Sequence, residues 1–310
     1  MSRIVITEFM DEAAVQRIAA SHDTLYAPDL VDRRADLLAQ VATTDVLIVR
    51  NRTRVDTDLL AAAPRLQAVG RLGVGLDNID MEGCQARGIT VWPATGANDL
   101  AVAEYVITTA MMLLRGAYAA TDRVVAGEWP RQDLIGTEAS ALTLGLMGYG
   151  AIARHVARRA QAMGMRVIAH DPHLPADDPA WGDVAPVSRA VLLAGSDVIS
   201  LHVPLTPQTR HMIDAAALRA MRPGAVLINA ARGGVVDEDA LADALRQGHL
   251  AGAALDVFEV EPLTAEAGQR FAGLSNLILT PHIAGVTAQA NVRVSSLIAD
   301  RVLDHLAERV

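Results

Sequence analysis

Short apolar segments alternate with longer stretches of helical spacing along this sequence, in two successive series. In the first series the apolar segments are residues 4–7, 45–49, 66–70 and 89–91. In the second they are residues 142–147, 166–169, 198–202, 225–230, 252–258 and 277–281. Such alternation is typical of parallel strands that are covered by helices on both faces. It predicts an α/β protein with two doubly wound parallel sheets and a boundary near residues 97–100.

Several longer segments have the spacing of helices. Amphipathic helices are predicted for residues 11–20, 151–163 and 287–310. The stretch 99–126 is longer and more apolar than an ordinary surface helix, and it contains Gly116. It is compatible with a core helix followed by a break, or with a helix that crosses between domains or into a partner subunit. A length of 310 residues is typical of two domains.

The basic residues are all arginines. Lys+Arg is 27, and the sequence contains no lysine. This excludes a lysine Schiff base, pyridoxal-phosphate chemistry, a P-loop lysine and a lysine general base. The net charge of −9 argues against non-specific nucleic-acid binding, which needs a basic surface. A small anionic substrate is compatible with this charge through a local cluster of arginines.

Other features of the sequence bear on where in the cell the protein is located. No apolar run reaches the roughly 18 residues of a membrane span, and the nearest candidate, 105–114, is too short. The first nine residues read as a strand and lack the features of a signal peptide. One cysteine, Cys84, allows neither an intramolecular disulfide framework nor a multi-cysteine metal site. We therefore expect a cytoplasmic protein that binds no membrane and no metal.

A glycine-rich segment lies between a predicted strand and a predicted helix. Residues 148–153 read GYGAIA, the G-x-G-x-x-A form of the dinucleotide fingerprint. Gly148 would allow the tight turn, and Gly150 would let the backbone approach a pyrophosphate at the helix N-terminus. Asp171 follows the next strand about 20 residues further on, where a carboxylate binds ribose hydroxyls and repels a 2′-phosphate. The segment predicts NAD rather than NADP; the alternative is a glycine turn in a domain that binds no nucleotide.

Three polar residues follow later strands of the second series: Arg232, Glu261 and His282. Open α/β sheets bind ligands at the carboxyl ends of their strands. An arginine there can hold a substrate carboxylate, and a histidine can take a hydroxyl proton as hydride leaves. The glutamate can orient the imidazole and stabilise its protonated form. Together they predict hydride transfer from a hydroxy acid.

With these residues in view, the sequence resembles the D-isomer-specific 2-hydroxyacid dehydrogenases over essentially its whole length. The motifs that carry the resemblance are VGRLGVGLDNID (69–80), GLMGYGAIA (145–153), HDPH (170–173), HVPLTPQT (202–209), INAARGGVVDEDAL (228–241), ALDVFEVEP (254–262) and TPHIAG (280–285). The resemblance implies catalytic roles for Arg232, Glu261 and His282, NAD as the cofactor, and a homodimer. Formate dehydrogenases of the family have glutamine at the position of Glu261, which argues against formate as the substrate.

The family fold implies two Rossmann-like lobes with a cleft between them. Residues 1–98 plus 286–310 would form a flavodoxin-like substrate lobe, and residues 99–285 the NAD-binding lobe. Carried over by motif, the cofactor contacts are Gly148, Gly150, Ala151, Ile152, Asp171, Val203, Pro204, Ala230, Asp256 and Gly285. Asp256 is either a nicotinamide contact or a helper of the active site. The substrate carboxylate would meet Arg232 and the backbone of Leu72, Gly73, Val74 and Gly75.

Arginines near this predicted substrate loop bear on the substrate. Arg50, Arg52 and Arg54 alternate after the strand 45–49, and Arg71 precedes the loop. Arg50 and Arg71 could bind a second anionic group of the substrate; the alternative is ordinary surface ion pairs.

Two subgroups of the family resemble parts of the sequence. Residues 69–80 are similar to 3-phosphoglycerate dehydrogenases, although the chain leaves no room for their common C-terminal regulatory domain. The segments ITEFMDEAAV, YAPDLVDRRADLL and VRNRTRVD resemble a sulfolactate dehydrogenase branch. We therefore expect a small D-configured 2-hydroxy or 2-oxo acid with a second anionic group, such as (S)-sulfolactate. The alternatives are 3-phosphoglycerate dehydrogenation and glyoxylate or hydroxypyruvate reduction.

A protein of another class is also compatible with the motifs. The family includes corepressor-like proteins that keep the same three polar residues and use NAD as a conformational signal. No peptide-docking motif or tail is visible in this sequence. Tight NADH binding without turnover would favour this class.

Overall fold

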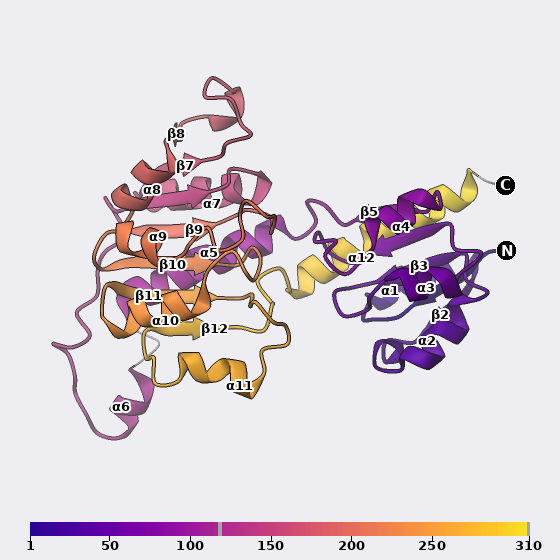
Figure 1. Cartoon of the computed structure of the whole chain (residues 1–310), viewed down its shortest axis with the longest axis horizontal. Helices are drawn as coiled ribbons and strands as arrows, with labels where there is room; N and C mark the ends of the chain where they lie inside the picture. Colours follow the sequence, from indigo (N-terminus) through magenta and orange to yellow (C-terminus); the bar gives the residue numbers. More distant parts are fainter. Residues whose placement is uncertain (117–119, 309–310) are drawn as a thin grey trace. The chain divides into compact units, whose positions relative to one another are not determined.

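The computed structural model describes residues 1–116 and 120–308, which divide into two compact units (Figure 1). Unit 1 comprises Met1–Asn98 and Val286–Val310, and unit 2 comprises Asp99–Gly285. Each unit contains one sheet in which all paired strands are parallel, with apolar clusters against the sheet. The predicted class, two doubly wound α/β folds, is confirmed.

Unit 1 has five strands: β1 (Arg3–Ile6), β2 (Asp23–Tyr26), β3 (Val46–Val49), β4 (Ala68–Arg71) and β5 (Thr90–Pro93). Their order is β2-β1-β3-β4-β5, so the strand order reverses between β1 and β3. Its helices are α1 (Glu12–Ala19), α2 (Arg34–Val41), α3 (Thr57–Ala62), α4 (Met81–Ala86) and α12 (Ala288–Ala307), with the 3₁₀ turn η1 (Leu30–Asp32). Ile4 and Ile6 join one apolar cluster and Val5 another, because successive side chains of a strand point to opposite faces.

Helix α12 belongs to the core of unit 1, although it lies at the other end of the chain (Figure 1). Ile298 and Val302 are fully buried among residues of β1 and β3. A Cβ at Gly70 in β4 would lie 2.6 Å from Cγ2 of Ile298, so a glycine is needed for this close approach. The Thr287 side chain accepts a hydrogen bond from the backbone N–H of Ala290 and caps the helix.

Unit 2 has seven strands: β6 (Thr143–Met147), β7 (Arg166–His170), β8 (Ala185–Pro186), β9 (Val198–Leu201), β10 (Ala225–Asn229), β11 (Leu250–Leu255) and β12 (Leu277–Leu279). Their order is β12-β11-β10-β9-β6-β7-β8, with a reversal between β6 and β9. Its helices are α5 (Asp99–Arg115), α6 (Thr121–Val125), α7 (Ala151–Ala162), α8 (Arg189–Gly195), α9 (Ala215–Ala220), α10 (Glu238–Arg246) and α11 (Ala265–Gly268), with the 3₁₀ turns η3 (Pro179–Trp181) and η4 (Gln269–Phe271). No helix within the described ranges has the length and apolar content needed to cross a membrane.

The structure corrects some of the predicted elements. The stretch 99–126 is a core helix that ends at Arg115 and is followed by a break at Gly116, which has φ +59°; α6 is separate. Residues 117–119 of the predicted stretch 99–126 and residues 309–310 of the predicted helix 287–310 lie outside the described residues. Two edge strands, β2 and β8, were not predicted, since β2 is only partly buried and β8 has two exposed residues. The predicted strand at 252–258 is β11, which ends at Leu255, so Asp256 begins the loop after it.

Candidate active site

The glycine-rich turn lies where the strand order of unit 2 reverses, between β6 and β9. Gly148 has φ +88°, and a Cβ there would lie 2.5 Å from the carbonyl oxygen of His202, the residue after β9. Only glycine combines this conformation with this close approach. A Cβ at Gly150 would meet no heavy atom within 4 Å, so the backbone there is open to a ligand. Gly150 is also the N-cap residue of α7 and has no side chain to satisfy the first N–H groups of that helix.

Asp171 completes the dinucleotide pattern beside this turn. One of its carboxylate oxygens accepts a hydrogen bond from the backbone N–H of Tyr149 at 2.9 Å. The other accepts from the backbone N–H of His173 at 2.9 Å. A carboxylate has about four acceptor positions, so these bonds leave capacity for two ribose hydroxyls. The turn, the open start of α7 and Asp171 together fit the pyrophosphate and ribose of a dinucleotide.

The other predicted cofactor positions also follow strands of unit 2 or begin α7. Ala151 and Ile152 open α7, Val203 and Pro204 follow β9, Ala230 follows β10, and Gly285 is the last residue of unit 2. Burial lowers the pKa of His202 to about 4, which keeps it neutral at physiological pH. Its Nε2 lies 3.0 Å from Oγ of Ser200. His202 therefore lies at the end of β9, where its carbonyl oxygen packs against Gly148.

His282 and Glu261 form a pair at the carboxyl ends of β12 and β11. Nδ1 of His282 lies 2.7 Å from Oε2 of Glu261, and Oε1 of Glu261 accepts a hydrogen bond from the backbone N–H of Phe258 at 3.0 Å. Burial acts to raise the pKa of Glu261, but the bonds to His282 and Phe258 and the charge of Arg232 lower it more. The pKa of Glu261 therefore lies below its ordinary value. Because Nδ1 is engaged, Nε2 is the ring nitrogen that can face a substrate.

The turn that carries His282 is held by Asp256. His282 has φ +55°, a left-handed conformation that is uncommon for residues other than glycine. The Asp256 carboxylate, 1% exposed, accepts hydrogen bonds from the backbone N–H groups of Ile283 and Ala284, both at 2.8 Å, and from the Thr280 hydroxyl at 2.6 Å. Of the two roles considered for Asp256, these contacts support the helper that shapes the active-site turn.

Arg232 lies on the turn after β10, the neighbour of β11. The amide of Asn229 closes this turn: its Nδ2 donates to the carbonyl oxygen of Arg232 at 2.9 Å, and its Oδ1 accepts from the N–H of Ala231 at 3.1 Å. A Cβ at Gly233 would lie 1.7 Å from the carbonyl oxygen of Phe258, so this turn touches the backbone of the loop that carries Glu261. The adjacent parallel strands β10, β11 and β12 thus bring Arg232, Glu261 and His282 to the carboxyl-terminal side of the sheet of unit 2.

In unit 1 the predicted substrate loop, Leu72, Gly73, Val74 and Gly75, directly follows β4. A Cβ at Gly73 would lie 1.5 Å from a guanidinium nitrogen of Arg71, so this guanidinium lies against the backbone of the loop. The absence of a side chain at Gly73 makes room for it. Arg71 and the loop are therefore close enough to act on one ligand.

Arg50 follows β3 and is held from the end of β1 by Glu8. The Glu8 carboxylate, 5% exposed, accepts hydrogen bonds from the backbone N–H groups of Arg50 at 2.8 Å, Thr53 at 2.9 Å and Arg52 at 3.1 Å. The guanidinium of Arg50 donates to Oδ1 of Asn291 at 2.9 Å. Burial lowers the pKa of Arg50, and the nearby charge of Glu8 opposes this effect. Asn291 is neutral, so this bond does not neutralise the charge of Arg50.

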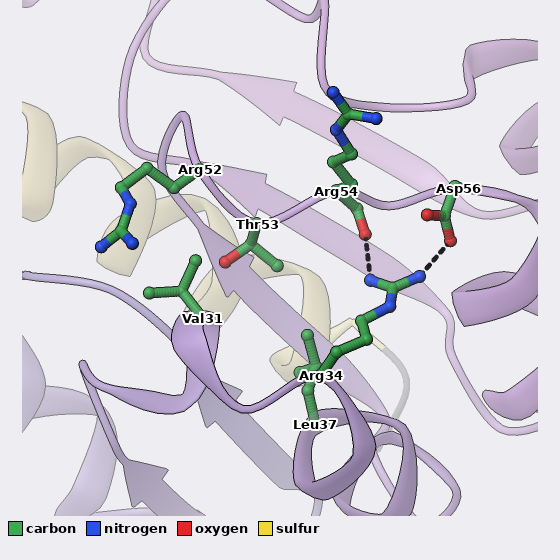
Figure 2. A pocket seen from close by; sticks show the side chains of 7 residues that line it. All are labelled: Val31, Arg34, Leu37, Arg52, Thr53, Arg54 and Asp56. Carbon is green, nitrogen blue, oxygen red and sulfur yellow. Dashed lines mark hydrogen bonds and ion pairs between the residues drawn. The ribbon is translucent and has the colours of Figure 1, made fainter. Parts of the chain in front are cut away.

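Arg52 and Arg54 line a pocket of unit 1 that Arg50 and Arg71 do not line (Figure 2). Its lining residues are Val31, Arg34, Leu37, Arg52, Thr53, Arg54 and Asp56. Arg34 bridges the carbonyl oxygen of Arg54, at 2.8 Å, and the carboxylate of Asp56. Arg52 forms an ion pair with Asp32. These contacts support a surface ion-pair role for Arg52.

Sequence reasoning missed Glu8, although a carboxylate directly after a buried strand is a recognisable signal. It also missed the contact of Gly233 with Phe258. This contact joins two loops that are distant in the sequence, so no short motif marks it. Cys84 is free and buried in unit 1. Within the residues that the structure describes, no group of three or more His, Cys, Asp or Glu side chains is arranged to hold a metal ion.

Comparison with known proteins agrees with this geometry. The chain matches the model of the D-isomer specific 2-hydroxyacid dehydrogenase, NAD binding domain, over residues 107–284. It is 57% identical over 310 residues to (S)-sulfolactate dehydrogenase of Chromohalobacter salexigens, with 100% of both chains covered. It is 36% identical over 304 residues to hydroxypyruvate reductase of Thermotoga maritima, with 98% of each covered. The crystal structure of D-lactate dehydrogenase from Aquifex aeolicus, complexed with NAD and lactic acid, gives a TM-score of 0.86 at 28% identity and covers 99% of this chain and 96% of that one.

The chain therefore belongs to the D-isomer specific 2-hydroxyacid dehydrogenases. It is an NAD-dependent oxidoreductase that acts on a small 2-hydroxy or 2-oxo acid. The family, the enzyme class and the cofactor predicted from the sequence are confirmed.

Proposed function

We propose that this enzyme oxidises a D-configured 2-hydroxy acid that carries a second anionic group, with (S)-sulfolactate as the candidate substrate. The observation that carries the chemistry is the 2.7 Å pair of His282 and Glu261 beside Arg232. The second anionic group is supported by the charge of Arg50 and by the position of Arg71 against Gly73. The 57% identity to an (S)-sulfolactate dehydrogenase supports the same substrate.

The residues act as follows. Nε2 of His282 takes the proton of the substrate hydroxyl while the C2 hydride leaves, and Glu261 stabilises the imidazolium through Nδ1. Arg232 binds the substrate carboxylate with its planar, charged guanidinium. The 148–153 turn and Asp171 would hold NAD+, which would accept the hydride during oxidation and, as NADH, supply it during reduction. In the reverse direction His282 returns its proton to the carbonyl oxygen of the oxo acid. In the 72–75 loop the N–H groups of Val74 and Gly75 would donate to the same substrate carboxylate, because those of Leu72 and Gly73 donate to the carbonyl oxygens of Val49 and Arg71.

The stereochemistry agrees with this substrate. Sulfolactate with D-like geometry is named S, because the sulfonate raises the priority of the CH2 arm. An enzyme specific for the D geometry would therefore use the S enantiomer.

The test is NAD+ reduction, followed by NADH absorbance, with both sulfolactate enantiomers, D-3-phosphoglycerate, D-lactate, D-glycerate and malate. Clear preference for (S)-sulfolactate is the expected result. Preference for D-glycerate or D-lactate would keep the enzyme class and remove the role of Arg50 and Arg71. Tight NADH binding without turnover of any acid would contradict the proposal and favour a corepressor-like protein.

We further propose a homodimer. The segment after α5 exposes large apolar side chains: Val125 is 83%, Trp129 77% and Ile135 74% exposed. Several such side chains within one short segment are typical of an interaction surface. Trp129→Glu should shift the sedimentation of the protein toward the monomer, whereas Arg131→Ala, an exposed polar change in the same segment, should not. A wild-type protein that sediments as a monomer would refute the dimer.

A further inference from the structure

A buried carboxylate outside the residues assigned so far supports the loop that carries Glu261. Glu238, the first residue of α10, is 3% exposed. Its Oε1 accepts a hydrogen bond from the backbone N–H of Glu259 at 2.6 Å, and its Oε2 lies 3.4 Å from a guanidinium nitrogen of Arg270. The N-cap of α10 is Asp237, whose side chain accepts from the N–H of Ala240. Glu238 is therefore not needed to cap its own helix.

Arg270 and His211 fix the side chain of Glu259 as well. The guanidinium of Arg270 lies 3.7 Å from Oε2 of Glu259 and 3.5 Å from the exposed carboxylate of Asp239. Nε2 of His211 lies 3.0 Å from Oε1 of Glu259. Glu259 is thus held through its backbone by Glu238 and through its carboxylate from two other segments.

Glu259 adjoins the groups that set the geometry of the active site. The preceding N–H, that of Phe258, donates to Oε1 of Glu261, whose other oxygen pairs with His282. The carbonyl oxygen of Phe258 lies against Gly233, next to Arg232. A shift of residues 258–259 would therefore disturb Glu261 and Arg232 together. Removing a carboxylate from water costs free energy. A buried glutamate that does not cap its own helix therefore indicates that its charge has another role.

We propose that Glu238 and Arg270 are positioning residues, which lock the 256–261 loop so that Glu261 meets His282 in a single geometry. This inference rests on the proposed role of the His282–Glu261 pair. Both residues act through the backbone and side chain of Glu259, and neither is assigned a contact with substrate or cofactor.

The test compares Glu238→Gln with Asp243→Asn in the full chain. Both changes remove one negative charge from α10, but Glu238 is buried, whereas Asp243 is exposed and pairs with Arg246. For Glu238→Gln we expect a loss of kcat on the order of 10- to 100-fold, because small displacements of catalytic groups are costly. NADH binding, read by fluorescence, should persist, and Asp243→Asn should behave as wild type.

A second readout separates positioning from general damage. The charged groups that face Glu261 are His282 and Arg232, and both, with the Phe258 N–H, keep its pKa low. A loosened loop should therefore raise the pKa of Glu261, which carbon NMR of its carboxylate measures directly. Lower kcat with an unchanged pKa of Glu261 would mean a merely structural role and would overturn the proposal.

The NMR readout needs no turnover. An inactive wild-type enzyme would therefore refute the proposed function, whereas an unchanged pKa of Glu261 in Glu238→Gln would refute the positioning role alone. If Glu238→Gln fails to bind NADH, Arg270→Lys replaces it, since lysine keeps the charge but not the fork of donors. Arg270→Lys is expected to change kcat and the pKa of Glu261 in the same directions, and wild-type values of both would overturn the proposal.

Discussion

Nδ1 of His282 and Oε2 of Glu261 lie 2.7 Å apart, the distance of a charge-assisted hydrogen bond. The turn that carries His282 is tied to Asp256, and the carboxylate of Glu261 is tied to the Phe258 N–H. Both partners are thus fixed by backbone bonds before any ligand binds. This preorganisation favours a proton transfer that needs little rearrangement.

The first prediction concerns the proton acceptor. His282→Ala should lower turnover by roughly 10²- to 10⁴-fold, because general acid–base catalysis contributes about that much. NADH binding should persist, since His282 lies apart from the 148–153 turn in the sequence and on a different strand end. Steady-state kinetics and NADH fluorescence check both parts. Wild-type turnover in this variant would rule out His282 as the base.

The second prediction concerns pH and stability. The pKa of Glu261 in the folded protein lies below its ordinary value, so ionised Glu261 stabilises the fold. This contribution is fully present above the ordinary carboxyl pKa and is lost as pH falls through the lower, folded-state pKa. Glu261→Gln should therefore lower the Tm near neutrality, and the difference from wild type should shrink as the solution is acidified. Thermal denaturation at several pH values measures this, and a constant difference would contradict it.

The third prediction separates two glycines of one turn. Gly148→Ala places a Cβ 2.5 Å from the carbonyl oxygen of His202 at φ +88°, so the Tm should fall. Gly150→Ala meets no atom within 4 Å, so the fold should tolerate it, while NADH binding weakens because the methyl group crowds the pyrophosphate. Calorimetry and NADH titration distinguish the two variants. Unweakened NADH binding in Gly150→Ala would place the pyrophosphate elsewhere.

The fourth prediction concerns the choice between NAD and NADP. Asp171→Ser removes the carboxylate that would bind the ribose hydroxyls and repel a 2′-phosphate. The ratio of kcat/KM with NAD+ to that with NADP+ should therefore fall. An unchanged ratio would mean that another residue selects the cofactor.

The fifth prediction tests the substrate arginine against a neighbour. Arg50→Ala should raise the KM for (S)-sulfolactate by roughly 10-fold or more, because a hydrogen bond to a charged group is worth about 1.5–3 kcal/mol. The KM for D-lactate, which lacks the second anionic group, should change little. Arg52→Ala is the matched control, since Arg52 pairs with Asp32 and lines a pocket that Arg50 does not line. Equal effects of Arg50→Ala on both substrates would remove its specificity role.

The sequence predicts most of this fold because its buried strands are apolar and regularly spaced. Strands such as β3 and β10 are fully buried and read directly from their residues. The edge strand β2 reads DTLY and is only partly buried, so neither alternation nor an apolar run marks it. The two residues of β8 include a proline, which gives no strand signal.

For the candidate site, local motifs identify residues on the loops that follow strands directly. Arg232, Glu261 and His282 are of this kind, and the structure places them at the carboxyl-terminal side of one sheet. The Glu238–Arg270 contact could not be predicted, because its partners are 32 residues apart and Glu238 looks like an ordinary acid in a first helical turn. The role of Asp256 was open for a similar reason, since its bonds reach a turn 27 and 28 residues further along the chain.

Helix α12 has a consequence for the order of folding during synthesis. The core of unit 1 needs Ile298 and Val302, which the ribosome produces after unit 2, whereas unit 2 is made from the continuous stretch Asp99–Gly285. The nascent chain thus holds all strands of both sheets, but the face of the first sheet around Gly70 stays uncovered until α12 is made. Translation therefore favours early folding of the dinucleotide-binding unit, whereas the core of unit 1 is completed only when α12 emerges.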